Sequence, residues 1–450
     1  NSVARLSSAR CVGQTDRMMT ESEALETLAR EDPAVASDAR AALRWLTSGG
    51  GLEVISQLRL QEFLWHVLPS SWPLSPAGQL AVARALGRLL TLAGLERYAA
   101  ACASTDTERI ITAYDSSLAD GITSYQRTVE VSHVAPPDTD LLAWGSAKGP
   151  EEQAAYEACA AAIELAISSS ELKPGMSGWR TKRATLVDRW LTSTDLGTDT
   201  LLGKISAERI DEWAHGHPGD RARMARRVVP RLLEPPVLPN EPLPALRWLL
   251  QHADAGLPLT TRHYISPSLV AEAADMFGWA ELAGRRCQEL AVFPLHTLRG
   301  LAQREMGAVR RSGTSLVLTR TGRLMADDPG IRWHIGTSAL IGPDDRPDPD
   351  FTVAVREAAL LVIALSGDAV SYDELAGRLT GLHATEGWTS RSGGKLGDAI
   401  RYEVSVLGQR LRALQLLDLS GPSGSLTLTS TGIAAALSSL LARALRPRHG

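Results

Sequence analysis

Apolar residues recur at helical spacing along most of this chain. Between Leu396 and Leu414, six apolar side chains lie three or four positions apart, which places them on one face of a helix. The same spacing runs from Thr20 to about Asp115, and Thr20-x-x-Glu23 at its start has the form of a capping box. These patterns predict a mainly α-helical fold in which each helix buries one apolar stripe.

Two stretches break the helical pattern. Residues 116–149 lose the periodicity and gain Gly, Ser, Thr and Pro, so we expect a long loop with room for one strand at Ser124–Val131. Pro230–Pro244 holds six prolines in fifteen residues and cannot lie inside a helix, because proline lacks the amide N–H that a helix needs. It predicts an extended linker between domains. Clustered Asp and Pro residues at Pro343–Asp350 predict a second boundary.

These breaks divide the chain into six expected parts. They are a disordered leader (1–19), a helical domain (20–115), the long loop (116–149), a helical domain (150–233) and two C-terminal units (245–342 and 351–450). In the second helical domain, helices are expected at Pro150–Ser168, Thr181–Leu191, Ser206–Ala214 and Asp220–Leu233.

The two C-terminal units share one phrase, Ser-Leu-x-Leu-Thr-x-Thr-Gly, with six identities in eight positions. It stands at Ser315–Gly322 and at Ser425–Gly432. In each unit three helical patterns precede a hairpin that contains the phrase, and Thr-x-Thr-Gly suits a strand end that caps the next helix. The alternative is a coincidence between two unrelated hairpins that each continue into a helix.

Each unit therefore has the same expected order of elements. In the first, helices are expected at Ala245–His252, Pro267–Phe277 and Pro294–Met306, with strands at Val309–Arg311 and Ser315–Thr319. In the second, helices are expected at Thr352–Leu365, Tyr372–Leu379 and Lys395–Leu414, with strands at Leu416–Leu419 and Ser425–Thr429 and a closing helix to about Leu445.

This order resembles the winged helix-turn-helix superfamily, over residues 245–325 and 352–446. The resemblance implies a helical N-terminal half followed by two C-terminal winged-helix units with small β-hairpins. It also implies that the third helix of a unit enters the major groove of DNA with the hairpin beside it, although other members bind only proteins. A separate segment, Ser56–Trp72, is similar to actinobacterial proteins and implies no function.

Charge is distributed unevenly along the chain. Residues 1–220 hold 20 basic and 29 acidic residues, whereas residues 221–450 hold 27 basic and 22 acidic residues. The acidic half is a candidate surface for a protein partner, and the basic half fits the phosphates of double-stranded DNA. The helix at Arg221–Arg231 fits either a clamp on the DNA backbone or a partner of the acidic half.

The candidate DNA-binding residues are polar side chains opposite the buried stripe of each third helix, together with the first hairpin. They are His296, Arg299, Gln303, Arg304, Arg310, Arg311, Arg320, Arg401, Gln409 and Arg412. Arginine and glutamine can bind base edges as well as phosphate. In the second unit the carboxylates of Asp398 and Glu403 would repel phosphate. Its hairpin, Ser420–Ser430, has no basic residue.

The sequence lacks the common signatures of catalytic and cofactor sites. It has no phosphate-binding loop, no dinucleotide-binding glycine motif, no His-Glu-x-x-His pair and no Gly-x-Ser-x-Gly elbow, so we expect neither an enzyme nor a cofactor. Four dispersed cysteines exclude a Cys-x-x-Cys zinc site and favour the cytoplasm. The longest apolar run, Ala358–Leu365, is far too short to cross a membrane.

The sequence thus predicts a cytoplasmic DNA-binding protein, a transcriptional regulator whose helical half senses a ligand or binds a partner. Two units packed with two-fold symmetry could address half-sites about 34 Å apart. The alternative is a non-enzymatic scaffold whose winged helices bind protein rather than DNA.

Overall fold

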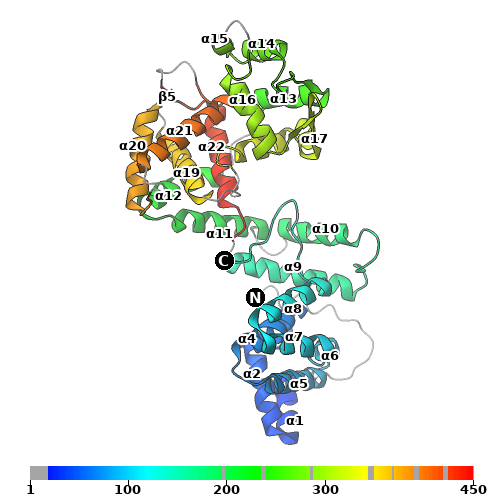
Figure 1. Cartoon of the computed structure of the whole chain (residues 1–450). Helices are drawn as coiled ribbons and strands as arrows, with labels where there is room; N and C mark the ends of the chain where they lie inside the picture. Colours follow the sequence, from blue (N-terminus) through cyan, green and yellow to red (C-terminus); the bar gives the residue numbers. More distant parts are fainter. Residues whose placement is uncertain are drawn as a thin grey trace. The chain divides into compact units, whose positions relative to one another are not determined.

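The computed structural model of the chain is mainly helical, with a few short antiparallel strands (Figure 1). It describes residues 19–194, 198–234, 240–283, 287–342, 349–366, 369–389, 395–418 and 424–448. The expected leader, apart from Met19, lies outside these residues. The chain divides into two compact units, residues 1–206 with 447–450, and residues 207–446.

The first unit contains helices and loops but no strand over its described residues, and residues 133–149 form a loop, as expected for that part of 116–149. Its elements are α1 (Glu21–Glu31), α2 (Pro33–Thr47), η2 (Leu52–Val54), α3 (Gln57–Glu62), η3 (Phe63–Val67), α4 (Leu68–Ser71), α5 (Pro76–Leu92), α6 (Glu96–Cys102), α7 (Thr105–Ser116), α8 (Leu118–Ser132), α9 (Pro150–Ser168), α10 (Trp179–Thr192) and the start of α11 (Leu201–Gly216). The expected capping box is present, because Thr20 accepts the N–H of Glu23 and the Glu23 side chain accepts that of Thr20. Phe63 and Leu86 are fully buried in the hydrophobic core that these helices enclose.

Helix α8 overturns one expectation, since Leu118–Ser132 is neither loop nor strand. Ser117 caps the helix by accepting the N–H of Asp120. Its buried positions include Gly121 and Thr128, and a Cβ on Gly121 would stand 2.3 Å from the Tyr114 ring. The inward face is therefore lined partly by small and polar residues that allow close packing on α7. Ile122, Tyr125 and Val129 lie beside them at helical spacing and are half-buried, so an apolar stripe is present but is mixed with glycine, serine and threonine.

The second unit combines helices with two small sheets. Its elements after α11 are α12 (Gly219–Leu233), α13 (Pro244–Asp254), β1 (Leu257–Pro258), α14 (Pro267–Met276), α15 (Ala280–Ala283), α16 (Phe293–Gly300), η4 (Leu301–Glu305), β2 (Val309–Ser312), β3 (Ser315–Leu318), α17 (Arg320–Asp327), α18 (Pro329–Ser338), α19 (Pro349–Ser366), β4 (Val370–Ser371), α20 (Tyr372–Thr385), α21 (Leu396–Ala413), β5 (Ser425–Leu426) and α22 (Ser430–Ala444). The strand orders are β1-β3-β2 and β4-β5, all antiparallel.

The first hairpin is confirmed, with β2 paired to β3 from Val309 opposite Leu318 to Ser312 opposite Ser315. In the second copy, residues 419–423 of the predicted hairpin lie outside the described part. Among the described residues, Leu417 bridges Leu428, the Asp418 N–H donates to the Thr427 carbonyl over 2.8 Å, and β5 pairs with β4.

The division between the units differs from the linker expected at Pro230–Pro244. Pro230 lies inside the last turn of α12, contrary to the expectation for this stretch, at the loss of one helical hydrogen bond, and residues 235–239 lie outside the described part. Helix α12 packs on α19, α20 and α22, and the Arg231 guanidinium donates to the Ala364 carbonyl over 2.8 Å. The contacts of α12 therefore place it with the C-terminal half of the chain.

A buried polar group joins α12 to α20. Arg221 is buried, forms an ion pair with Glu386, and stands 3.2 Å from Nε2 of His383. Since Nδ1 of His383 donates to the Leu379 carbonyl over 2.9 Å, its Nε2 is the acceptor for Arg221. Arg221 is therefore neither a clamp on the DNA backbone nor a partner of the acidic half, because the residues it contacts lie inside the second unit.

The buried histidines His383 and His217 lead us to expect that the second unit loses stability in acid. Burial, with a further contribution from the Arg221 charge, lowers the pKa of His383, and burial also lowers the pKa of His217. A folded state with lowered histidine pKa binds fewer protons than the unfolded chain, so stability is complete above about pH 6.5 and falls as the pH drops. Unfolding by urea at pH 7.5, 6.5 and 5.5 should show this loss, and His383→Gln should reduce its slope. An equal slope in the variant would contradict the assignment.

The structure of the first copy explains why Thr319 and Gly322 of the repeated phrase are needed. Thr319 caps α17 by accepting the N–H of Gly322, and its own N–H donates to the Ala308 carbonyl over 2.9 Å. This hydrogen bond holds the start of α17 against the chain just before β2. A Cβ on Gly322 would stand 2.0 Å from the Ala308 oxygen, so only glycine fits there.

The second copy repeats these contacts atom for atom. Thr429 caps α22 by accepting the N–H of Gly432, and its N–H donates to the Leu416 carbonyl over 3.0 Å. A Cβ on Gly432 would stand 2.1 Å from that oxygen. The shared phrase therefore marks a shared junction between a hairpin and a helix.

Replacing Gly432 with alanine should destabilise the second unit by about 1–3 kcal/mol, because the backbone must move to admit the methyl group. Gly377→Ala is the matched control. Gly377 is also helical, but a Cβ there meets no atom within 4 Å, so alanine should stabilise the protein by about 0.5–1 kcal/mol. Urea unfolding measures both, and equal effects would refute the steric explanation.

Candidate nucleic-acid interface

The third helix of the first copy is built from α16 and the π-helical turn η4. The apolar positions Leu295, Leu298 and Leu301 are buried, as their spacing predicts. Beyond Gly300 the helix widens, and the Met306 N–H bonds to the Leu301 carbonyl over 2.9 Å. A π-turn inserts an extra residue in the helical register, so the residues after Gly300 are rotated relative to a regular helix.

Part of the polar face of α16 is bound to a buried carboxylate, Glu289. This side chain accepts the N–H of Ile265 over 2.6 Å, Nδ1–H of His296 over 3.0 Å and a guanidinium N–H of Arg299 over 2.9 Å. Burial alone would raise the pKa of Glu289, but the hydrogen bonds from His296 and Ile265 and the charge of Arg299 together lower it. The carboxylate is therefore ionised and holds its partners in place.

The predicted base-reading residues of α16 are consequently engaged within the protein. The Arg299 side chain is only 12% exposed, and its Nε donates to the Gln303 side chain over 3.2 Å. His296 is 49% exposed but keeps its bond to Glu289. Arg299 could reach a base only by breaking its buried ion pair. Glu289 lies outside every predicted helix, and no sequence signal marked it.

Five arginines around the first hairpin have a different environment. Arg304, Arg310, Arg311, Arg320 and Arg323 are all exposed. No ion pair joins them to a carboxylate in the part of the chain that the structure describes. From 307 to 323 the sequence contains four arginines and no acidic residue. We call these five residues the arginine hairpin.

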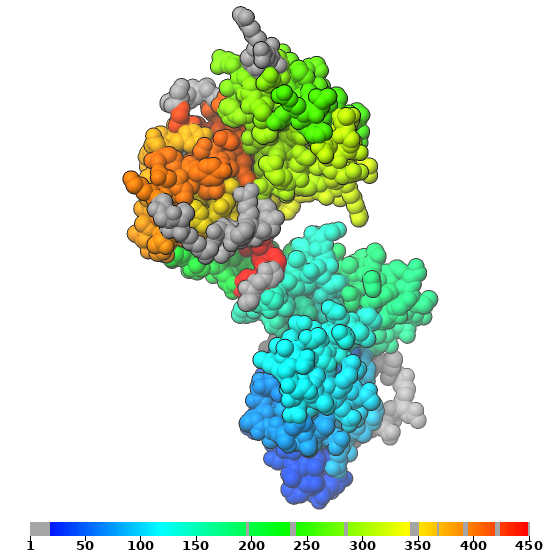
Figure 2. Space-filling model, viewed as in Figure 1, coloured from blue at the N-terminus to red at the C-terminus, as the bar shows by residue number. Residues whose placement is uncertain are grey.

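The five arginines come from three elements, η4, β2 and α17. Arg310 and Arg311 stand on β2, one of the two edge strands of its sheet, opposite Val317 and Leu316. The Thr319 bond to Ala308 brings the first turn of α17, which carries Arg320 and Arg323, to the base of the hairpin. The segment that contains them is coloured light green to yellow at the surface of the second unit in Figure 2.

The second copy offers less positive charge on its third helix. Arg401 is exposed but pairs with Asp398 over 3.2 Å and with Asp373 over 3.5 Å. Gln409 is exposed, whereas the guanidinium of Arg412 lies over the Phe293 ring, 5.3 Å from its centroid. The predicted set of the second copy therefore does not form one open basic surface.

The two third helices, α16 and α21, pack against each other (Figure 1). Arg410 of α21 reaches Glu305 over 3.0 Å in a buried ion pair and donates to the Ala339 carbonyl. Helices in contact have axes about 8–10 Å apart, whereas two recognition helices on successive major grooves need about 34 Å. The contact between α16 and α21 is therefore much closer than two separate half-sites would require.

The described residues also bear on metal and membrane binding. Among them no group of three or more His, Cys, Asp or Glu side chains is arranged to hold a metal ion. In the same residues no helix combines the length and the apolar character that crossing a bilayer requires. Comparison of the chain with protein-family models, curated proteins and solved structures finds no match.

Proposed function

We propose that this protein binds double-stranded DNA through the arginine hairpin, mainly by contacts to the phosphate backbone. The observation that carries the proposal is the set of five exposed arginines without carboxylate partners among the described residues. Guanidinium groups form bidentate, charge-assisted hydrogen bonds with phosphate, and unpaired ones need not break an internal ion pair first.

The order of elements supports a winged-helix assignment for both copies. From α13 to β3 the order is helix, strand, helix, the four-residue helix α15, helix and hairpin, and the strand order β1-β3-β2 places the hairpin beside the first strand. Apart from α15, the second copy has the same order from α19 to β5 with a reduced sheet. In this assignment the arginine hairpin is the wing, and the wing rather than the helix makes the main contact.

This arrangement favours binding that depends little on DNA sequence. Base recognition requires side chains that reach the groove edges, and Arg299 and Gln303 are bound to each other beside Glu289. Phosphate contacts fix position without reading sequence. We therefore propose a non-enzymatic, cytoplasmic protein with no cofactor. In this proposal, DNA binding is regulated by the ligand or partner that binds to the acidic helical unit.

The test is a fluorescence anisotropy titration with a short random-sequence duplex at 50 and 200 mM salt. Five phosphate contacts predict a slope of log affinity against log salt of about −4.5, which is about a 500-fold loss between the two salts. A second duplex of unrelated sequence should bind equally well. Absence of binding at 50 mM salt would refute the proposal.

One observation favours a second candidate, a protein-interaction scaffold. Because α16 and α21 cover each other, the surfaces that winged-helix proteins commonly present to DNA are partly occupied within the chain. In that case the acidic first unit and the exposed arginines would bind protein. The same titration separates the two, because a scaffold shows no steep salt-dependent binding to a duplex.

A further inference from the structure

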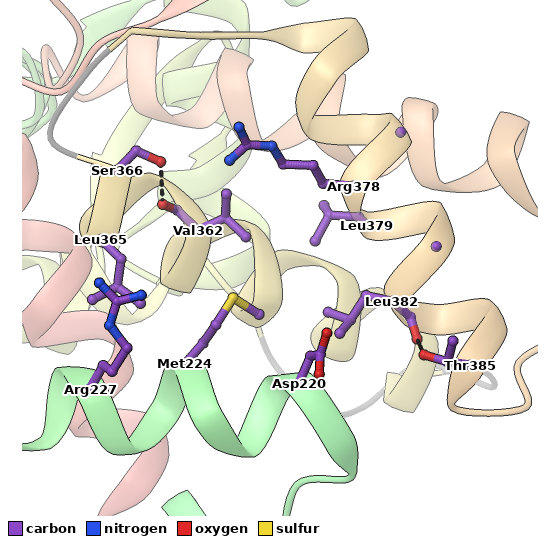
Figure 3. Close-up of a pocket in the computed structure, with 12 residues that line it drawn as sticks. Asp220, Met224, Arg227, Val362, Leu365, Ser366, Arg378, Leu379, Leu382 and Thr385 are labelled. Carbon is purple, nitrogen blue, oxygen red and sulfur yellow. Dashed lines mark hydrogen bonds between the residues drawn. The ribbon is translucent and has the colours of Figure 1, made fainter.

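A groove of about 680 Å³ lies between α12, α19 and α20 of the second unit (Figure 3). Its apolar lining comes from all three helices, and consists of Met224, Val362, Leu365, Leu379 and Leu382. This volume lies in the range of small-molecule sites, which are mostly apolar with a few polar groups that fix orientation. None of the residues that line it belongs to the arginine hairpin.

The charged side chains of the groove are arranged asymmetrically. In Figure 3, Arg227 from α12 and Arg378 from α20 extend toward the end marked by Leu365 and Ser366, whereas Asp220 stands at the other end. Arg227 has no ion-pair partner among the described residues. Among the described residues, the end near Ser366 therefore carries an excess of positive charge beside an apolar lining.

The carboxylates that the structure describes near the groove do not cancel this excess. Arg378 pairs with Glu374 on its own helix, but both side chains are about half exposed, and such pairs are weak and easily exchanged. Asp220 is already paired with Arg223. The positive end can therefore accept a further carboxylate.

One wall of the groove is bare helix backbone. Gly377 and Gly381 lie one turn apart on α20, both are exposed, and both line the groove. A Cβ at either position would meet no atom within 4 Å. The space beside α20 is thus open for an apolar chain to lie against the helix.

We propose that this groove binds an amphipathic anion, with an unbranched acyl chain on the apolar lining and a carboxylate held by Arg227 and Arg378. The chain would be stabilised by removal of apolar surface from water, and the head by charge-assisted hydrogen bonds. The ligand would contact α12, α19 and α20 together, three helices that already pack on one another. The proposal is independent of DNA binding.

The head group is tested by calorimetric titration with dodecanoate, dodecanol and dodecyltrimethylammonium, each below its aggregation concentration. Dodecanoate should bind most tightly and the cation least. Arg227→Gln should weaken dodecanoate binding by roughly 10- to 100-fold and leave dodecanol binding unchanged. The control is Arg226→Gln, which removes the same charge from an exposed position on α12 that does not line the groove.

The chain is tested by filling the groove with Gly381→Leu. This variant should fold, since the new side chain enters open space and leucine favours a helix over glycine, and its Tm should be unchanged or higher. It should lose binding of both dodecanoate and dodecanol. Undiminished binding in a folded Gly381→Leu variant, equal affinity for all three head groups, or binding only of an acidic amphipathic peptide would overturn the proposal.

Discussion

Simultaneous replacement of Arg310, Arg311, Arg320 and Arg323 with glutamine should weaken duplex binding by about a thousandfold near 100 mM salt. Each arginine that neutralises a phosphate contributes about 0.9 to the salt slope, so the variant should lose about 3.6 of the predicted 4.5. These side chains are exposed, so the fold should be unaffected. Anisotropy titrations at four salt concentrations measure both quantities.

The control for this variant removes four positive charges elsewhere, at Arg84, Arg88, Arg226 and Arg401. These residues are also exposed, and they lie outside the arginine hairpin. If only net charge mattered, the two variants would lose affinity equally. The account requires that the control keeps a salt slope close to that of the unmodified protein, and equal slopes in the two variants would contradict it.

Replacement of Glu289 with alanine should destabilise the second unit by about 3–5 kcal/mol. The substitution leaves the Arg299 guanidinium buried without its carboxylate and removes the acceptor of the Ile265 N–H. An uncompensated buried charge is far more costly than the loss of a surface ion pair. Urea unfolding followed by tryptophan fluorescence measures the change in the free energy of unfolding.

Two further variants separate this cause from others. The double variant Glu289→Ala with Arg299→Met removes both charges, so it should recover a large part of the lost stability. Glu281→Ala removes an exposed carboxylate from α15 and should change stability by less than about 0.5 kcal/mol. A Glu289→Ala effect as small as that of Glu281→Ala would mean that the ion pair contributes little.

Much of the helical architecture could be predicted from apolar spacing and caps. Pro150–Ser168 was predicted with the bounds that α9 has, and the capping box at Thr20 is formed as its sequence predicts. The same reasoning failed for α8, although Ile122, Tyr125 and Val129 lie three or four positions apart. The glycine, serine and threonine residues between them were read as signs of a loop, so composition outweighed a spacing that was present.

The candidate site was predictable only in its exposed part. The arginines near the hairpin could be found because charge and turn signals are local in sequence. The role of Glu289 could not, since a carboxylate that is buried and paired looks in sequence like one on a surface. The contact between α16 and α21 depends on pairs such as Arg410 with Glu305, which are far apart in the chain.

The most direct test of the account places a photo-crosslinking side chain at Ser312, the last residue of β2 and next to Arg311, or at Tyr402 on the exposed side of α21. After irradiation with a labelled duplex, crosslinked species are separated and counted. The account predicts efficient crosslinking from Ser312 and little from Tyr402. Crosslinking from Tyr402 alone, or from neither position at low salt, would contradict the claim that the arginine hairpin is the DNA-binding surface.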